Sequence, residues 1–499
     1  MKVCLIQIPW IVHNSRDIIL PYPLGIMYVA SYLEKHDVEV EIIDALALGF
    51  KNRIPIDKEG IRIGLSPHMI KNCIKKSKAD FFGVSCSFTT QSESMHETVK
   101  IIKEITNKPV FVGGAHPSLM PFDTMKDENI DFIVKGEGEL TALELIQTLG
   151  AGDGISDVSG LYYREEKTNE IVFSGEREPI KNLDDLPFPA YHLIPLDIYF
   201  NATKYGVGGR DSVSTGSRWA GIITSRGCPY KCTFCSSNVV WGRKWRFRSP
   251  DNIVEELKFL YKNYNINRIS FEDDNFTLIP ERVEELCEKI INEGLSIYWD
   301  VPNGIRADRL SSSLIRKMKK VGCLGLTIGV ESGDQSFLSN IIKKDLSLKK
   351  VEENASLIIQ ENISLSCFFI IGIPGENEII FNNSLNFARK LARRGAFCIF
   401  FIAVPLPGTE LYKHAKMNNY LLKENIGPFD YLMGMERPLL KTKDFSPSDL
   451  LRWKKRANRI TLLETIFHNP MLILRSNILK SIMSKGLLYT LRRSLRRIL

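Results

Sequence analysis

The sequence predicts an α/β protein with two parallel-sheet domains and a helical C-terminal region. Short apolar runs typical of strands alternate with amphipathic segments of helical spacing over residues 1–150, and the alternation resumes over residues 216–415. The composition, with 499 residues of which 44% are hydrophobic and 25% charged, excludes a disordered, collagen-like or small disulfide-stapled chain. Residues 151–215 are expected to form a hairpin and a linker, and residues 416–499 a helical region.

Residues 1–150 are expected to form a doubly wound sheet with helices on both faces. Its strands are predicted at residues 2–8, 38–44, 80–87, 109–114 and 131–139. Ligands of such sheets bind beyond the carboxyl ends of the strands. Small or polar residues stand at those ends, where a large flat ligand would need close approach to the backbone: Ser85, Ser87, Gly113, Gly114, Gly136 and Glu137.

The alternation in residues 216–415 predicts six strand–helix units. The strands are expected at residues 220–225, 267–273, 296–302, 324–331, 365–374 and 397–407. Six such units form an open or partial (β/α)6 barrel, whose chemistry lies at the carboxyl ends of the strands. Between the two sheets, SGLYYRE and EIVFSGE indicate a hairpin, followed by the proline-punctuated segment 183–195.

Three of the ten cysteines, Cys228, Cys232 and Cys235, lie on one loop directly after the first predicted strand of the barrel. Closely spaced thiolates bind iron–sulfur clusters, and three of them leave one iron of a cubane open for another ligand. A zinc knuckle is the alternative, but it requires a fourth Cys or His, and none follows within the next thirty residues. Inert core cysteines are a second alternative, which the flanking Gly227 and Pro229 disfavour because they mark a loop.

This CxxxCxxC loop resembles that of the radical S-adenosylmethionine (SAM) superfamily over about residues 215–415. The resemblance implies a [4Fe–4S] cluster on the three cysteines and cleavage of SAM to a 5′-deoxyadenosyl radical. It also implies SAM contacts at further strand ends, namely Phe234, Glu272, Asp273, Asp274, Arg306, Glu331, Ser332 and Gly372. The alternatives are local: an acidic turn or helix cap at 272–274, pairing of Arg306 with Asp308 or Asp300, and a plain tight turn at Gly372.

The first domain resembles the cobalamin-binding domain of B12-dependent radical SAM enzymes, which is a Rossmann-like fold. The matching segments contain Ser85, Ser87, Gly113, Gly114, Gly136 and Glu137, which the resemblance assigns to cobalamin. A DxHxxG signature after the first strand is absent, so we expect cobalt without a protein histidine ligand and treat His13 and His116 as polar loop residues. A doubly wound sheet alone does not fix the ligand, and a nucleotide remains the alternative.

Together these resemblances imply an N-terminal cobalamin domain, a TIM-like radical SAM barrel and methylation of an unactivated carbon through methylcobalamin. A radical SAM cyclase or oxidoreductase without methyl transfer, and a non-catalytic cobalamin- or iron–sulfur-binding sensor, are the alternatives. The expected partners are a small-molecule or lipid-like substrate and an external electron donor such as flavodoxin or ferredoxin. We expect no nucleic-acid partner.

The positive charge is concentrated in the C-terminal region. Residues 451–499 contain twelve Lys and Arg against Glu464 alone, a net charge of +11, which leaves −3 for the preceding residues because the total is +8. Leu488, Leu491, Leu495 and Ile498 form an apolar stripe on a basic segment, and such a helix binds anionic membrane surfaces or docks on its own protein. The chain begins without a signal peptide and has no apolar run near the ~18 residues that span a bilayer, so we expect a cytoplasmic protein with possible peripheral membrane contact.

Overall fold

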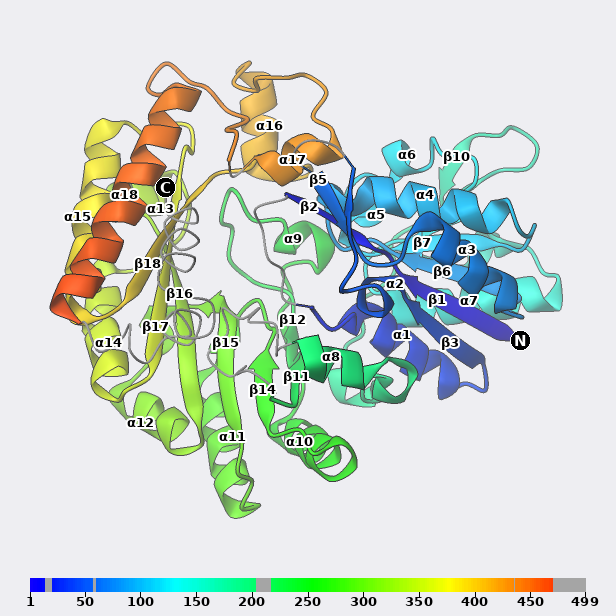
Figure 1. The fold of residues 1–499 in the computed structure, drawn as a ribbon, viewed down its shortest axis with the longest axis horizontal. Coiled ribbons are helices and arrows are strands. Elements are labelled where there is room, and N and C mark those ends of the chain that lie inside the picture. The colour runs from blue at the N-terminus through cyan, green and yellow to red at the C-terminus, as the bar shows by residue number, and fades with distance from the viewer. Residues whose placement is uncertain (14–19, 57–59, 203–216, 435, 470–499) are drawn as a thin grey trace. The chain divides into compact units, whose positions relative to one another are not determined.

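The computed structural model describes residues 1–13, 20–56, 60–202, 217–434 and 436–469. The chain divides into two compact units (Figure 1). The first unit comprises Met1–Ala202 together with Val239–Gly242 and Gly427–Leu432, and the second comprises the other described residues. Among the described residues, no helix is both long enough and apolar enough to cross a membrane.

The first unit contains a seven-stranded sheet in the order β10-β9-β8-β7-β6-β1-β3. The strands from β8 to β3 are parallel, which confirms the predicted doubly wound sheet. The bounds are β1 Lys2–Gln7, β3 Glu39–Asp44, β6 Phe81–Ser85, β7 Val110–Gly113, β8 Phe132–Val134, β9 Leu161–Arg164 and β10 Ile171–Phe173. The hairpin expected in the connecting segment therefore forms β9 and β10, and it extends this sheet through antiparallel pairing with β8.

Helices cover both faces of the first sheet. One face packs its apolar side chains against α3 and α4, and the other against α1 and α7, in two separate hydrophobic clusters. The bounds are α1 Leu24–Glu34, α2 Ala45–Leu48, α3 Pro67–Lys76, α4 Ser92–Lys103, α5 Ala115–Leu119, α6 Pro121–Thr124, α7 Gly138–Ala151 and α8 Leu196–Ala202. A separate antiparallel sheet, in the order β2-β5-β4, was not predicted; its strands are β2 Trp10–His13, β4 Arg53–Pro55 and β5 Gly60–Ile63.

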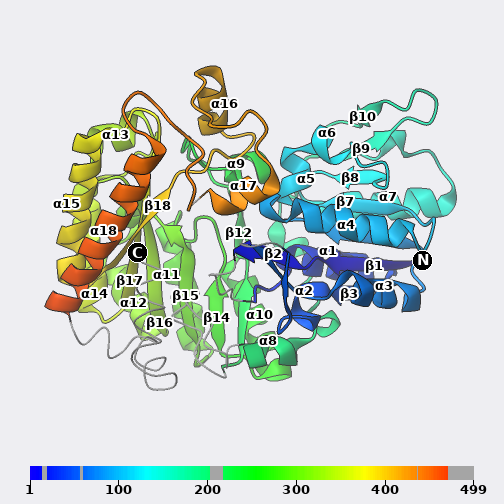
Figure 2. The same cartoon turned by 45° about the horizontal axis from the view of Figure 1, so that its top comes forward.

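The second unit is built on a six-stranded, fully parallel sheet in the order β11-β14-β15-β16-β17-β18. Each strand follows its sequence predecessor, as six consecutive strand–helix units require, and the predicted partial barrel is confirmed (Figure 2). The bounds are β11 Trp219–Ile222, β14 Arg268–Phe271, β15 Tyr298–Ile305, β16 Cys323–Glu331, β17 Ser364–Ile371 and β18 Phe397–Ile402. A two-stranded ribbon, β12 Ser225–Arg226 and β13 Arg246–Phe247, flanks the cysteine loop.

Helices lie along the outer side of this second sheet (Figure 1). Most of them begin at a Ser, Thr or Asn whose side chain accepts a hydrogen bond from the backbone of the first turn, which satisfies an otherwise free N–H. The helices of this outer layer are α10 Pro250–Tyr264, α11 Pro280–Asn292, α12 Ser312–Lys320, α14 Leu348–Gln360, α15 Glu378–Arg394 and α18 Pro447–His468. The other described helices after β11 are α9 Ser237–Val240, α13 Gln335–Asn340, α16 Glu410–Met417 and α17 Pro428–Met433, of which α17, apart from Met433, belongs to the first unit.

Helix α18 satisfies the free edge of β18. The Asn458 side chain accepts from the Phe400 N–H at 2.8 Å and donates to the Phe400 carbonyl at 3.3 Å. The hydroxyls of Thr461 and Thr465 donate to the carbonyls of Cys398 and Ala396, both at 3.3 Å. These polar side chains supply the partners that a seventh strand would otherwise provide to the edge of the sheet.

We expect Asn458→Ala to destabilise the second unit. The substitution leaves the buried Phe400 N–H and C=O without partners, and each such group costs about 1–3 kcal/mol. Urea unfolding should therefore show a loss of at least about 2 kcal/mol. Arg459→Ala, on the exposed side of the same helix, is the control and should change the unfolding free energy by less than about 0.5 kcal/mol. Equal stability of the two variants would contradict this role of Asn458.

Candidate functional site

The carboxyl ends of the six parallel strands in the second unit lie together at one end of its sheet. The cysteine loop follows β11 and β12 there, and the segments after β14, β15, β16 and β17 carry Glu272, Arg306, Ser332 and Gly372. The sheet therefore brings to the carboxyl ends of its strands the residues that the sequence analysis assigned to the cluster and to SAM.

The chain that enters the cysteine loop is fixed by a buried carboxylate. Asp273 accepts hydrogen bonds from the Thr224 N–H at 2.5 Å and the Ser225 N–H at 3.1 Å, and also from the Thr224 hydroxyl. Burial raises the pKa of Asp273, while these donors and the nearby Arg282 oppose that effect. The carboxylate is therefore committed to holding the loop.

The rest of the cysteine loop is held from three further directions. The Thr233 N–H donates to the Ile342 carbonyl at 3.1 Å, and the Thr233 carbonyl accepts from the Leu411 N–H at 2.8 Å. The Asn238 amide donates to the Tyr230 carbonyl at 2.6 Å. Ser237 donates to Asp274 at 2.5 Å, so this carboxylate also stabilises the loop.

The three thiols of the loop are half-buried, whereas most of the other cysteines are fully buried in the cores. Burial raises the pKa of all three, that of Cys235 to about 12. Among the described residues, no three His, Cys, Asp or Glu side chains converge as ligands of one metal ion. Cys228 and Cys232 are among the charges that raise the pKa of Cys235, so the three thiols lie near one another, as the ligands of one iron–sulfur cluster must. Phe234 is half-buried within the same loop.

Arg306 joins the end of β15 to the cysteine loop. Its guanidinium forms a two-point ion pair with Asp308, at 2.9 and 2.7 Å, and also donates to the Asp345 carbonyl. It lies 3.9 Å from the centre of the Tyr230 ring, a cation–π contact within the loop. The pairing with Asp308, an alternative left open by the sequence, is therefore present. Nevertheless Nη1 is buried without a hydrogen-bond partner, so one cationic donor is left for a ligand.

The end of β16 contains a buried ion pair that the sequence analysis missed. Lys344 donates to Glu331 at 2.9 Å and to the Gly329 carbonyl at 2.6 Å. Burial works to lower the pKa of Lys344, but Glu331 and Cys232 outweigh it and leave the pKa raised. Glu331 itself has a φ of +66°, a left-handed conformation that non-glycine residues adopt at a cost. Nothing in the local sequence distinguishes Lys344 from its exposed neighbour Lys343.

The segments after β16 and β17 are shaped mainly by contacts to their own surroundings. The Ser332 and Ser384 hydroxyls lie 3.1 Å apart, and Ser332 also accepts from the Asp334 N–H at 3.1 Å. Gly372 has a φ of +88°, and a Cβ there would lie 2.8 Å from Leu450. Glu272, after β14, is half-buried, and its carbonyl accepts from the Asn303 amide at 2.9 Å.

A buried carboxyl group, Glu376, closes the loop after β17. One oxygen accepts from the Gly372 N–H at 2.5 Å, and the other is buried without a partner. Burial raises the pKa of Glu376 to about 8.

The strand ends of the first unit form a second cradle of small residues. Gly114 has a φ of +106°, and a Cβ at this position would lie 2.6 Å from the Cys86 carbonyl oxygen, so only glycine fits. Ser118, which the sequence analysis missed, accepts from the Gly136 N–H at 2.9 Å and donates to the Gly114 carbonyl at 2.8 Å. Ser118 therefore ties together the two glycine loops that follow β7 and β8.

The other predicted cobalamin residues differ in their surroundings. Ser85 and Gly113 end the adjacent strands β6 and β7 and pair with each other in register. Ser87 is exposed, whereas Glu137 accepts a hydrogen bond from the Ile180 N–H at 2.8 Å. His116 is buried 3.3 Å from the Thr89 hydroxyl, and burial lowers its pKa to about 4. These residues fit a flat ligand that approaches the backbone closely, with His116 packed inside the unit.

Comparisons with known proteins match both units. A family model of the radical SAM superfamily matches residues 222–388, and a model of the B12 binding domain matches residues 20–146. An uncharacterised methyltransferase of Pyrococcus horikoshii is 32% identical over 442 residues, which cover 87% of this chain and 86% of that protein. The cytidylyl-2-hydroxyethylphosphonate methyltransferase of Streptomyces wedmorensis is 31% identical over 79% of this chain and 77% of its own length.

The fold also resembles a solved structure. The radical S-adenosylmethionine methyltransferase TsrM from Kitasatospora setae, solved with tryptophan and a SAM analogue, has a TM-score of 0.67. The match covers 93% of this chain and 88% of TsrM at 18% sequence identity. At this identity the match supports the fold alone.

Glu376 should make stability depend on pH. The folded protein keeps the Glu376 proton up to about pH 8, whereas an unfolded chain releases it near 4.5, so ionisation of this group disfavours folding across that window. Glu376→Gln mimics the protonated form. We expect the unfolding free energy of the wild type to fall as the pH rises from about 5 to 8, and that of the variant to lack this fall. The difference in favour of the variant should grow by up to about 1.4 kcal/mol per pH unit.

Denaturant unfolding at several pH values measures this gain. Glu378→Gln, which changes an exposed carboxylate two residues away, is the control and should track the wild type. A parallel pH dependence of the Glu376→Gln variant and the wild type would show that Glu376 is not protonated in the fold.

Proposed function

The chain belongs to the cobalamin-dependent radical SAM methyltransferase family, and we propose that it transfers a methyl group from SAM to an unactivated carbon of a small-molecule substrate. Membership rests on the two matched domain models and on a relative that is 32% identical over 87% of the chain. Its cofactors are therefore a [4Fe–4S] cluster, SAM and cobalamin. The structural observation that supports the proposal is that hydrogen bonds fix the cysteine loop at the carboxyl ends of the strands of a six-stranded parallel sheet.

In this proposal Cys228, Cys232 and Cys235 hold the cluster, with one iron left for SAM. Asp273, Thr233 and their partners keep the loop in place, which favours a single cluster geometry. Asp273 and Asp274 then act through the loop, because both carboxylates bind loop residues.

Arg306 is the residue best suited to the SAM carboxylate. Its Nη1 is a buried cationic donor without a partner, and the guanidinium is already oriented by Asp308 and Tyr230. Glu272 and Glu331 offer acceptors for the SAM ammonium. Phe234, Ser332 and the Gly372 loop are assigned to its nucleoside portion, with Lys344 holding Glu331 in its left-handed conformation.

We assign cobalamin to the strand ends of the first unit. Gly113, Gly114 and Gly136 provide backbone without side chains, and Ser85 and Ser87 provide hydroxyls. Glu137 supports the neighbouring chain through the Ile180 N–H. Because His116 is buried beside Thr89, we infer that cobalt is bound without it.

When bound, the cofactors would supply a radical that removes a substrate hydrogen and a methyl group that replaces it. The overall reaction would consume two molecules of SAM and two external electrons, and it would yield the methylated product, S-adenosylhomocysteine, 5′-deoxyadenosine and methionine. The protein residues bind and orient these groups and exclude water around the radical. An external reductant is therefore required, and flavodoxin or ferredoxin is our proposed donor. Membrane contact through the basic tail stays a prediction, because residues 470–499 lie outside the described part of the chain.

Product analysis of the reconstituted enzyme tests the reaction class. We expect the anaerobically loaded wild type to form 5′-deoxyadenosine and, with each methyl transferred, S-adenosylhomocysteine. The Cys228→Ala/Cys232→Ala/Cys235→Ala variant should lose the cluster absorption band, 5′-deoxyadenosine formation and the sustained S-adenosylhomocysteine formation that depends on turnover. The corrinoid absorption should remain in the variant, because its proposed residues lie in the other unit. Only 5′-deoxyadenosine would indicate a cyclase or oxidoreductase, and neither product would indicate a sensor.

Arg306→Gln should weaken SAM binding. Loss of a charge-assisted hydrogen bond worth about 1.5–3 kcal/mol corresponds to a roughly 10- to 100-fold higher Kd. Equilibrium dialysis of SAM against cluster-loaded protein measures this change, with Arg316→Gln on the exposed side of α12 as the control. An unchanged Kd together with reduced cluster loading would mean that Arg306 only fixes Tyr230.

A further inference from the structure

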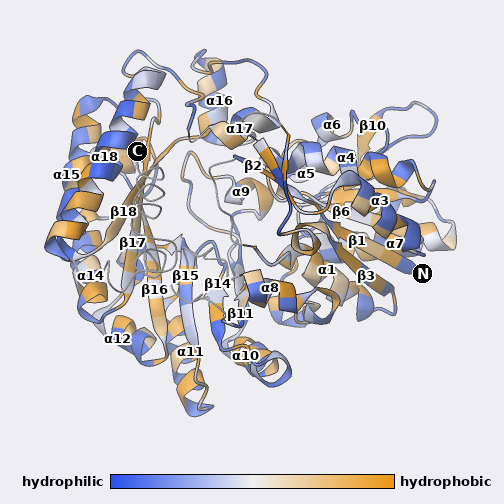
Figure 3. Cartoon of the chain, viewed as in Figure 1, coloured by the Kyte–Doolittle hydropathy of each residue, from blue (hydrophilic) through white to orange (hydrophobic). Residues whose placement is uncertain are grey.

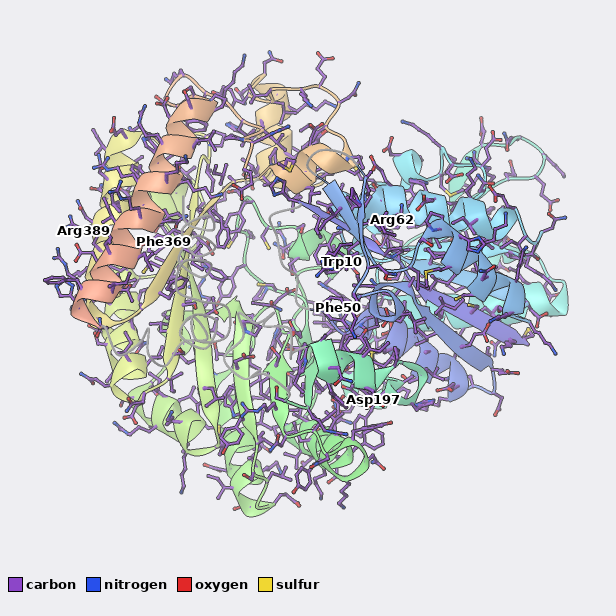
Figure 4. All side chains as sticks on the ribbon, viewed as in Figure 1. Trp10, Phe50, Arg62, Asp197, Phe369 and Arg389 are labelled. Atoms are coloured by element: carbon purple, nitrogen blue, oxygen red, sulfur yellow. The ribbon has the colours of Figure 1, made fainter. Side chains whose placement is uncertain are left out.

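The two faces of strands β17 and β18 differ in exposure. On the outer face, Phe369, which is labelled in Figure 4, stacks on Phe400 with ring centres 4.7 Å apart, and both rings are fully buried. The alternate residues on the inner face are less covered. The apolar ones among them are Phe368, Ile370, Ile399 and Phe401, each half-buried, and Phe397, which is 37% exposed; β17 begins with Ser364 and Ser366 on this face. We refer to these five inner residues as the apolar wall.

The residues of the apolar wall form one continuous surface. Phe368 pairs in register with Ile399, and Ile370 pairs with Phe401, so their side chains lie side by side on two neighbouring strands. The Phe368 and Phe401 rings meet edge to face, with centres 5.2 Å apart and planes at 88°. Strands β17 and β18 also stand out as hydrophobic in Figure 3.

The remainder of the inner face has a different character. One register row crosses the sheet from β11 to β17 through small or polar residues only, namely Gly221, Ser270, Asp300, Gly325 and Ser364. Within that row Ser270 donates to Asp300 at 2.8 Å. The inner face is therefore small and polar along this row, near the amino ends of the strands, and hydrocarbon farther along β17 and β18.

The apolar wall leads directly to the proposed SAM site. Glu331 pairs in register with Phe369, the neighbour of Phe368, and Gly372 follows Ile370 by two residues. Glu331 ends the neighbouring strand β16 and Gly372 directly follows β17, so a group lying on the wall is next to both residues. A contiguous, partly exposed apolar face is typical of a ligand-binding surface, and covering it with an apolar group is favourable because the hydrocarbon leaves water.

We propose that the apolar wall binds a hydrocarbon portion of the substrate, an alkyl, prenyl or aromatic group, and that the methylated substrate is therefore largely apolar. This inference rests on the proposed methyl transfer for its identification of the occupant as substrate.

Binding of hydrocarbon probes to the full-length holoenzyme tests this assignment. Geraniol, n-decanol and 2-naphthalenemethanol serve as probes in equilibrium dialysis, each quantified by mass spectrometry. We expect the wild type to bind at least one of them, and Phe368→Ser and Phe401→Ser to weaken that binding at least about tenfold, because small losses of apolar contact in a pocket have effects of this size. Ile379→Ser, which replaces a 72% exposed residue of α15, is the matched control and should bind as the wild type does.

The cluster absorption band reports whether each variant keeps its fold, and Phe368→Leu and Phe401→Leu replace any serine variant that loses it. Absence of binding by the wild type, or equal binding by the wall variants and the control, would overturn the proposal. Tighter probe binding after Leu491→Asp/Leu495→Asp would overturn it differently, by showing that the C-terminal segment occupies the wall.

A separate product assay of the wild type and Ile379→Ser keeps the two hypotheses apart. Formation of 5′-deoxyadenosine and S-adenosylhomocysteine without probe binding would refute the substrate class and keep methyl transfer. Probe binding that depends on Phe368 and Phe401, without those products, would refute methyl transfer and keep the apolar binding site.

Discussion

The geometry of the cysteine loop depends on the way in which Thr224 is held. Its N–H and hydroxyl donate to the buried Asp273, while its carbonyl accepts from Arg282 at 3.0 Å and from the Arg248 N–H at 2.9 Å. The backbone is thus fixed from both sides immediately after β11. Charge-assisted hydrogen bonds of this kind are the stronger ones in proteins, and burial keeps water from competing for them. A loop that must present three thiolates to one cluster needs such an anchor, because its own sequence is too short to form a core.

An open sheet of six strands has two edge strands, here β11 and β18, and a helix supplies hydrogen-bond partners to the free side of β18. Asn458, Thr461 and Thr465 recur at intervals of three and four residues, which places them on one side of α18 facing β18. Polar side chains on a buried helix face are costly unless they are paired, and here each one is paired with the strand. Helix α18 therefore replaces a seventh strand at the free side of β18. Because it lies on the outside of the sheet, it leaves the inner face of β17 and β18 partly uncovered.

Much of the fold could be predicted from the sequence, because its parallel strands are continuous apolar runs between amphipathic segments. Strands β2, β4 and β5 could not, since three or four residues carry no clear periodicity. The spacing of Cys228, Cys232 and Cys235 is local and could be recognised. Contacts across the chain could not: Asp273 binds residues about fifty positions earlier, and Lys344 resembles any surface lysine until β16 brings Glu331 to it. The hairpin β9–β10 was recognised, but its pairing with β8 depends on a neighbouring strand that local pattern does not specify.

The charged residues beside the cysteine loop and the apolar residues of β17 and β18 lie in different parts of the barrel and suit different ligands. Arg306 and Lys344 are both buried, and each is balanced by one carboxylate, Asp308 or Glu331. Buried ion pairs contribute little to stability, since desolvation offsets the attraction between the charges, so the fold alone gives little reason to keep two of them together. They are understandable where charged cofactor groups must be bound in place of water. The wall built around Phe368 and Phe401 has no charges, and an ionic ligand there would lose its hydration without compensation. The charged strand ends around Arg306 and Lys344 are consequently suited to the cofactors, and the apolar wall to a substrate whose carbon is to be methylated.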